Sequence, residues 1–307
     1  MINNCPICDH NDFKFSDYLI APKQEEWEYD CFKGNKLATC NNCEFTFASQ
    51  VFEEGSLSKF YNTLYSGNEL SVFKASENYE FAARSLSHVN FIKANLELKN
   101  YLNILEIGPN ENGMIPSFSL YCKPNYFYYD QLEFPVINHY GGKRLGKYFS
   151  KNEAFQINSN KKMDLIVLSH CLEHFEPQYI NQDIEAMSLA LKPNGCVSIE
   201  VPLQTLFHAP HTQSFRVKNM SMLFEKHGFK IIATQEINSP IGKFRGEVIN
   251  KSSKPSRFII NQIKNIMSIS MPRKIRLMFL KPFYERKLMP LYDGRPYMRV
   301  LAQKIHI

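Results

Sequence analysis

The stretch Tyr101-Leu-Asn-Ile-Leu-Glu-Ile-Gly108 decides the fold of this chain. Its short apolar run leads directly into a glycine, which predicts a buried strand followed by a tight turn. A glycine at this point lets the backbone turn sharply and approach a ligand closely, because it carries no side chain. The sequence Glu106-Ile-Gly-Pro-Asn-Glu-Asn-Gly113 is therefore a candidate binding loop.

Apolar runs and helical patterns alternate on the C-terminal side of this strand. The predicted strands are 101–108, 126–130, 163–169, 196–201, 229–233 and 297–303. The predicted helices are 78–100, 171–174, 183–191 and 220–227. Lys192-Pro-Asn-Gly195 is expected to stop the third helix. Strands that alternate with helices argue for a parallel sheet covered on both faces.

The residues that directly follow each strand are the candidate site. In an open parallel sheet, ligands bind beyond the carboxyl ends of the strands. Asp130 ends the second strand, some twenty residues after Gly108, and is placed to accept hydrogen bonds from two ribose hydroxyls. Ser169 and His170 follow the third strand. The order and spacing of these residues predict a nucleoside site.

The chain resembles class I S-adenosylmethionine-dependent methyltransferases over roughly residues 78–240 and the final strand. The residues that carry the resemblance are Leu105-Glu-Ile-Gly108, Asp130, Asp164-Leu-Ile-Val-Leu-Ser-His-Cys-Leu-Glu-His174, Leu191-Lys-Pro-Asn-Gly195 and Leu223-Phe-Glu-Lys-His-Gly-Phe229. The resemblance implies an α/β, Rossmann-like sheet that is mostly parallel with an antiparallel last strand. It also implies an enzyme that uses S-adenosylmethionine.

The resemblance further implies how the cofactor is bound. Glu106, Gly108 and Asn110 would line its methionine side, Asp130 would hold the ribose, and Ser169 and His170 would flank the adenosine or the sulfonium. The loop departs from the family pattern, which has glycines where this chain has Asn110 and Asn112. Asparagine tolerates positive φ better than most residues, so the loop can still form.

Two histidines are candidate catalytic residues. His211 follows the fourth parallel strand, where such enzymes place groups that touch the acceptor, and His170 follows the third. A neutral histidine there takes a proton from a hydroxyl or amine as the methyl group moves. The alternative for His211 is a surface-loop histidine.

His170-Cys-Leu-Glu-His174 also matches the spacing of inverted zinc peptidases. The match begins at the end of a buried strand, and no third ligand is identifiable in the sequence. Glu173 and His174 are otherwise predicted to be a pair at a helix start with local hydrogen bonds.

Two Cys-x-x-Cys pairs lie near the N-terminus, Cys5-Pro-Ile-Cys8 and Cys40-Asn-Asn-Cys43. Four thiolates complete the tetrahedral coordination of zinc and leave no open position for chemistry, so the pairs predict a structural zinc ribbon. A disulfide framework is the alternative. The remaining cysteines are scattered, and the start of the chain lacks a secretory pattern, which favours zinc.

Composition and patterning divide the chain of 307 residues into five predicted segments. These are a zinc-ribbon-like domain (1–56), a helical connector or lid (57–100), a Rossmann-like methyltransferase core (101–240), a basic helical insert (241–295) and a final core strand (296–307). The whole chain carries a net charge of +6, whereas residues 243–304 carry fifteen Lys and Arg and only three acids. A solvated helical cap, a membrane-surface contact, a subunit contact and an acidic acceptor all fit this insert.

The N-terminal cysteines resemble the zinc-binding domain found ahead of some sugar C-methyltransferases and relatives associated with bacterial surface polysaccharides. The resemblance implies a small sugar-derived acceptor, nucleotide-linked or part of a surface polysaccharide. Those enzymes carry a His-Glu-His-Phe run, and Ala209-Pro-His211 lacks the glutamate, so O- or N-methylation is favoured. The alternatives are a catalytically silent binding protein of the same fold and an RNA methyltransferase.

The sequence contains no apolar run long enough for a membrane span. We therefore expect a cytoplasmic enzyme with a small-molecule acceptor rather than nucleic acid as its partner. A homodimer stays open as a further alternative.

Overall fold

The computed structural model describes residues 1–17, 31–53, 55–57, 59–60, 75–109, 113–203, 211–237 and 296–305. Three sequence predictions lie outside the described residues: most of the connector before residue 75, the loop residues Asn110 and Asn112, and the basic insert 241–295. In the described part of the chain, no helix is long and apolar enough to cross a membrane.

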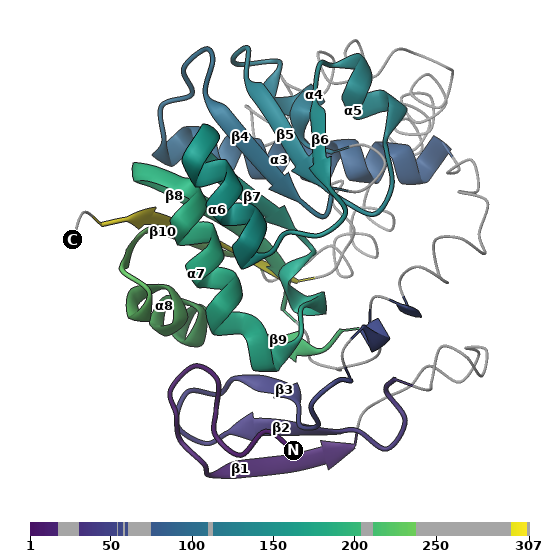
Figure 1. Ribbon diagram of the computed structural model, residues 1–307, viewed down its shortest axis with the longest axis vertical. Coiled ribbons are helices and arrows are strands. Elements are labelled where there is room, and N and C mark those ends of the chain that lie inside the picture. Colours follow the sequence, from purple (N-terminus) through teal and green to yellow (C-terminus); the bar gives the residue numbers. More distant parts are fainter. Residues whose placement is uncertain are drawn as a thin grey trace, which may run out of the picture.

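A seven-stranded sheet forms the centre of the molecule (Figure 1). Its order is β10-β11-β8-β7-β4-β5-β6, and β11 alone in this sheet runs antiparallel to its neighbours. The strands are β4 (Asn103–Ile107), β5 (Asn125–Tyr129), β6 (Lys143–Gly146), β7 (Met163–Ser169), β8 (Leu191–Pro202), β10 (Phe229–Ile237) and β11 (Tyr297–Lys304). The predicted Rossmann-like sheet with an antiparallel last strand is confirmed.

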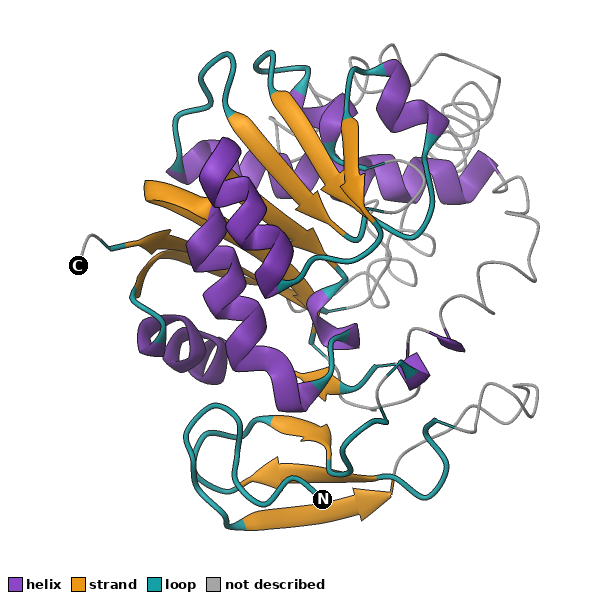
Figure 2. Cartoon of the chain, viewed as in Figure 1, coloured by secondary structure: helices purple, strands orange, loops and turns teal. Residues whose placement is uncertain are grey.

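Helices cover both faces of the sheet (Figure 2). One face carries α3 (Ala75–Asn95), α4 (Ile115–Phe118) and α5 (Pro135–His139), and the other carries α6 (Lys151–Asn160), α7 (Ile180–Ala190) and α8 (Val217–Lys226). In β7, Leu165 and Val167 pack into the cluster with α3 and α4, whereas Ile166 and Leu168 pack into the cluster with α6 and α7. Burial on both faces explains why this strand is continuously apolar.

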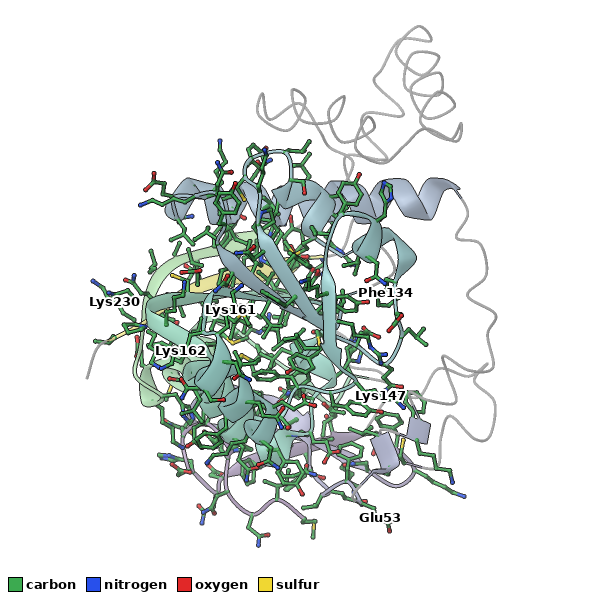
Figure 3. The ribbon with its side chains drawn as sticks, turned by 45° about the horizontal axis from the view of Figure 1, so that its top comes forward. Glu53, Phe134, Lys147, Lys161, Lys162 and Lys230 are labelled. Atoms are coloured by element: carbon green, nitrogen blue, oxygen red, sulfur yellow. The ribbon has the colours of Figure 1, made fainter. Side chains whose placement is uncertain are left out.

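The carboxyl ends of the parallel strands form one edge of the sheet. Phe134 and Lys147 follow β5 and β6, whereas Lys161 and Lys162 precede β7 and Lys230 lies at the start of β10. Figure 3 shows the first two on one side of the sheet and the other three on the opposite side. Among the predicted cofactor-binding residues, Glu106 and Ser169 lie at the carboxyl ends of β4 and β7, and Gly108, Asp130 and His170 directly follow strands, so they belong to the edge with Phe134 and Lys147.

A second, four-stranded sheet joins the N-terminal segment to the core. Its order is β1-β2-β3-β9, with β1 (Phe13–Asp17), β2 (Lys36–Cys40), β3 (Thr46–Ala48) and β9 (Gln213–Ser214). Strand β9 comes from the core and pairs with β3, with Phe47 opposite Gln213. The sequence did not predict this strand, because two residues without an apolar pattern give no strand signal.

The structure differs from the sequence predictions at several element boundaries. Helix α3 ends at Asn95 rather than at Asn100. The segment Leu191-Lys-Pro-Asn-Gly195 belongs to β8 and not to a separate turn. Met163 pairs with Leu191 and Leu165 with Cys196, so the predicted turn is retained as a bulge in the strand.

Two short elements also differ from the predictions. Residues Leu172–His174 form a 3₁₀ helix, η1, which is followed by a second one, η2 (Pro177–Tyr179).

Strand β6 was missed because its side chains are exposed or half-buried and its sequence, Lys143-Arg-Leu-Gly146, is largely polar.

Candidate active site

Gly108 forms the turn at the end of β4. Its φ is +65°, and a Cβ atom at this position would lie 2.4 Å from the Sγ atom of Cys171. Its N–H donates to the carbonyl of Tyr129 at 2.9 Å, which ties the loop to β5. Only glycine satisfies both the left-handed backbone and the space. Close packing against Cys171 and the left-handed backbone together therefore explain the glycine at this turn.

Glu106 holds the far end of the same loop. The buried carboxylate accepts hydrogen bonds from the Met114 N–H, at 2.8 Å, and from the Tyr126 hydroxyl. Gly113 has a φ of +50°, and a Cβ there would lie 3.1 Å from Glu106 Oε2. Glu106 thereby joins the end of β4 to Gly113 and Met114 on the far side of the loop, whose residues 110–112 lie outside the described part of the chain.

Asp130 lies directly after β5, as predicted. Its Oδ1 atom accepts a hydrogen bond from the Leu132 N–H at 3.1 Å, and its carbonyl accepts one from Arg144 Nε at 2.9 Å. Burial raises the pKa of Asp130 to about 6. We refer to Glu106, Gly108, Gly113 and Asp130 together as the β4–β5 half of the site.

His170 occupies the end of β7 with a φ of +52°. Its N–H donates to the Glu200 carbonyl at 2.8 Å, and its Nε2 lies 3.1 Å from Glu200 Oε1. Its Nδ1 lies 3.7 Å from Glu173 Oε1. The imidazole is therefore placed between two buried carboxylates, and burial lowers its pKa. Ser169, also predicted for the site, donates its hydroxyl to Glu200 Oε1 at 3.3 Å.

Glu200 is the most completely paired charge in this region. Arg299, from β11, donates from Nε to Glu200 Oε2 at 2.7 Å, and Arg299 Nη2 lies 2.6 Å from the same oxygen. Burial alone raises the pKa of Glu200, but Arg299 and then His170 outweigh it and hold that pKa well below its ordinary value. Arg299 also donates to the carbonyl and hydroxyl of Ser87 on α3. The pair therefore fixes α3 on the sheet.

A second buried carboxylate, Glu173, lies beside His174 and His211. One ligand atom from each of the three residues lies within 4.8 Å of the other two. The rings of His174 and His211 are 4.6 Å apart, and His174 Nε2 is 4.0 Å from Glu173 Oε1. Burial raises the pKa of Glu173 to about 8. We refer to His170, Glu173, His174, Glu200 and His211 together as the β7–β8 half of the site.

The structure brings the four N-terminal cysteines together. Cys5 Sγ lies 3.6 Å from Cys43 Sγ, and Cys8 Sγ lies 3.5 Å from Cys40 Sγ. Thiolates around one zinc ion at about 2.3 Å stand roughly 3.8 Å apart, so the cluster fits that ion with little adjustment. All four are free cysteines, as zinc coordination requires and as a disulfide framework does not.

The sequence prediction missed Glu200, Arg299 and the approach of His211 to Glu173. The sequence does contain a signal for the pair of Glu200 and Arg299. Each is a single charged residue inside an apolar strand pattern, and the two charges have opposite signs. No local signal links residue 173 to residue 211.

Comparison with known proteins identifies the family. A family model described as a methyltransferase domain matches residues 79–234, just over half of the chain. No curated protein sequence matches the chain.

Three solved structures are among those similar to this one. Burkholderia thailandensis 1,6-didemethyltoxoflavin-N1-methyltransferase has 13% identity and a TM-score of 0.49 over 89% of this chain and 97% of that chain. Haemonchus contortus phosphoethanolamine N-methyltransferase 2 has 11% identity and a TM-score of 0.47 over 85% and 62%. A SAM-dependent methyltransferase of Archaeoglobus fulgidus has 15% identity and a TM-score of 0.45 over 72% and 94%. On the match of the family model, the chain belongs to the methyltransferase family and is a class I S-adenosylmethionine-dependent enzyme.

Proposed function

We propose that this enzyme methylates a hydroxyl or amine of a small, sugar-derived acceptor, and that the four N-terminal cysteines hold a structural zinc ion. The observation that carries the proposal is the position of His170, which ends a central strand with its imidazole between Glu200 and Glu173. Transfer to a hydroxyl or amine releases a proton, and a neutral histidine at this edge accepts it.

The β4–β5 half fits S-adenosylmethionine. When bound, this cofactor supplies a methyl group on a positively charged sulfur. The left-handed turn at Gly108 and the hydrogen bond from Met114 to Glu106 hold the two described ends of the loop that would receive the methionine part. Asp130 carries a carboxylate that, when ionised, accepts hydrogen bonds from two ribose hydroxyls. Glu106 contacts the same loop through its hydrogen bond with Met114. Asn110 belongs to the part of the loop outside the described residues.

His170 is the residue that we assign to proton transfer. Burial lowers its pKa, so the imidazole is neutral at pH 7 and has a lone pair to offer. Glu200 is a positioning residue, because it contacts His170 Nε2 while Arg299 neutralises its own charge. Ser169 donates to the same carboxylate and supports this arrangement. His211, the second predicted catalytic histidine, belongs to the cluster with Glu173 and His174.

One feature supports a sugar-derived acceptor, and a second concerns the atom that is methylated. The cysteine cluster resembles the domain that precedes sugar methyltransferases, and the structure packs it against the site through the β3–β9 pairing. The missing glutamate before His211 favours oxygen or nitrogen over carbon as the methylated atom.

The test is a transfer assay with methyl-labelled S-adenosylmethionine and a panel of nucleotide-linked sugars, amino sugars and RNA. We expect label on a sugar or amino sugar, and we expect His170→Gln to lower kcat by about 10²- to 10⁴-fold with unchanged cofactor affinity. His139→Ala, at an exposed histidine of α5, is the control and should keep full activity. Label on RNA alone would overturn the acceptor class, and full activity of the His170 variant would overturn its role.

A further inference from the structure

The motif His170-Cys-Leu-Glu-His174 has a feature that proton transfer does not use. In the structure it begins directly after β7 and ends in the 3₁₀ helix η1, and it does not form the long helix of a zinc peptidase. His170 contacts Glu200, whereas Glu173 and His174 are joined by His211 from a distant segment. The third ligand that the sequence alone does not reveal is therefore present. We propose that Glu173, His174 and His211 bind a divalent transition-metal ion.

Glu173 is the strongest reason for this proposal. The side chain is 1% exposed, and neither carboxylate oxygen has a hydrogen-bond partner among the described residues. A buried carboxylate without a partner is costly, so proteins pair such groups or bind metals with them. Glu200, equally buried and only a few ångströms away across His170, is paired with Arg299. A bound cation would neutralise the carboxylate of Glu173, as the guanidinium of Arg299 neutralises that of Glu200.

The backbone around the cluster holds the three ligands in place. The Thr212 N–H donates to the Glu173 carbonyl at 2.8 Å, and the Thr212 hydroxyl donates to the carbonyls of Glu173 and Phe175. The buried Gln213 amide donates to the Leu172 carbonyl at 2.7 Å. These bonds clamp the chain on either side of Glu173 and His174 to the residues that follow His211. The ligands are therefore preorganised by two segments that do not move independently.

The N-terminal sheet also contacts the segment around Thr212 that holds Glu173 and His174. The Ala48 N–H donates to the Thr212 carbonyl at 2.8 Å, and β3 pairs with β9 directly after it. Lys218 and Asn219, at the start of α8, donate to the carbonyls of Asn42 and Cys43. The cysteine cluster thus stabilises the segment that carries His211.

The ligand set determines the class of metal. Two imidazole nitrogens and one carboxylate oxygen suit Zn²⁺, Fe²⁺, Co²⁺ or Mn²⁺, whereas Ca²⁺ and Mg²⁺ prefer oxygen ligands throughout. Three protein ligands leave coordination positions open, unlike the four thiolates of the cysteine cluster. Bound atoms at about 2.1 Å from one ion stand at most roughly 4.2 Å apart, so small side-chain rotations complete the site.

The open positions suggest what the ion does, and this step rests on the proposed function. Glu173 Oε1 lies 3.7 Å from His170 Nδ1, so an acceptor oxygen or nitrogen on the ion would lie next to the proposed proton acceptor. A metal ion lowers the pKa of a bound hydroxyl and fixes its position. The ion would therefore orient the acceptor, and His170 would take the released proton.

Cobalt binding tests the site directly. The full chain is first loaded with one equivalent of Zn²⁺ to fill the cysteine cluster, and it is then titrated with Co²⁺ while visible absorption and bound metal are recorded. We expect one further equivalent of Co²⁺, with a weak ligand-field band and no thiolate-to-cobalt charge transfer. Retention of the single zinc equivalent with no cobalt bound would overturn the proposal.

Variants assign the cobalt to the three residues. His211→Ala, His174→Ala and the isosteric Glu173→Gln should each lose the cobalt equivalent and retain the zinc, whereas His139→Ala should keep both. Retained zinc shows that each variant is folded at the N-terminal module, and cofactor titration of the same samples reports on the β4–β5 half. Cobalt binding by all three variants would overturn the assignment.

The two proposals fail separately. Cobalt binding without cofactor binding would contradict the proposed function and leave the metal site standing. Cofactor binding and methyl transfer that are unchanged when cobalt binding is abolished would overturn the role of the ion in catalysis.

Discussion

The two halves of the site lie on one edge of the same sheet, but they are built from contacts of different range. In the β4–β5 half, Glu106 bonds to the backbone of Met114, eight residues away, and Asp130 bonds to Leu132. In the β7–β8 half, Glu200 bonds to Arg299, ninety-nine residues away, and Glu173 meets His211 from beyond β8. The hydrogen bonds of the first half span at most 21 residues, from Gly108 to Tyr129, whereas those of the second half span up to 99 residues.

This difference explains what each half is suited to bind. A local loop with bare backbone makes few demands on the rest of the molecule, and the cofactor it receives is the same throughout the family. Side chains that converge from β7, β8, β9 and β11 depend on every element that carries them. We expect changes in the two halves to have separable effects on cofactor and metal binding.

The largest expected effect follows from removing one of the proposed zinc ligands. Cys43→Ser leaves a buried cluster of three thiols, and structural zinc contributes on the order of 10 kcal/mol to the folding of small modules. The N-terminal sheet should lose its zinc and its hydrogen-exchange protection, and residues 211–214 should lose protection with it.

The control for this change is Cys122→Ser, a buried cysteine outside the cluster, which should retain zinc. Cofactor affinity of the Cys43 variant should stay close to the original, because in the described part of the chain the β4–β5 contacts do not involve the N-terminal sheet. Full protection of residues 211–214 without zinc would contradict the coupling between the cluster and the β7–β8 half.

The next largest effect concerns the buried pair behind His170. Arg299→Met removes the two shortest ion-pair contacts of Glu200, which is 0% exposed, and we expect a loss of about 3–5 kcal/mol in the free energy of unfolding. Urea denaturation measures this loss. Adding Glu200→Gln to the same variant should recover most of the lost free energy of unfolding, because the buried negative charge is then removed.

The exposed pair of Lys151 and Glu185 provides the matched comparison. Both side chains are nearly half exposed, at 46% and 47%, so Lys151→Met should cost less than about 1 kcal/mol. Equal losses for the two substitutions would mean that the Glu200–Arg299 pair has no special role in building the β7–β8 half.

A smaller effect is expected in the β4–β5 half. Asp130→Asn keeps the shape of the side chain but removes the charged acceptor for the ribose hydroxyls. Hydrogen bonds to charged groups contribute about 1.5–3 kcal/mol, which corresponds to a loss of roughly 10- to 150-fold in affinity for S-adenosylhomocysteine. Calorimetric titration measures the loss, and Asp9→Asn, on the surface of the N-terminal module, is the control. Loss of cobalt binding in the Asp130 variant would contradict the expectation that changes in the two halves have separable effects on cofactor and metal binding.

The pH dependence of cofactor binding gives the smallest predicted effect. The pKa of Asp130 in the free protein is raised to about 6, so the group takes up a proton as pH falls through 6. Affinity for S-adenosylhomocysteine should fall about fivefold between pH 6 and pH 5 and stay nearly constant between pH 7 and pH 8.

The contribution of Asp130 to stability should run in the opposite direction. Its folded pKa lies above the ordinary value of 3.8, so the folded state binds the proton more tightly and this contribution rises as pH falls from about 6 to 4. A pH profile of affinity that is the same in Asp130→Asn would contradict the assignment of the titrating group.

The contrast between the halves also explains how much of the molecule the sequence could predict. The apolar pattern of β7 and the glycine after β4 are local signals, and the cysteine spacing is another, so the sheet, Gly108, Asp130 and the four-cysteine cluster were predictable. Strand β6 and the pairing of β9 with β3 were not, because their short polar sequences gain order only from neighbours. The meeting of Glu173 with His211 depends on that pairing. The β7–β8 half is built by long-range contacts, so local sequence patterns do not predict it.

The central claim is that the sheet edge at Gly108 and Asp130 binds the cofactor in this chain, even with asparagines at positions 110 and 112. Calorimetric titration of the zinc-loaded protein with S-adenosylmethionine tests it most directly. We predict one equivalent bound per chain, with an affinity that Asp130→Asn reduces. An absence of binding at millimolar S-adenosylmethionine would contradict the account.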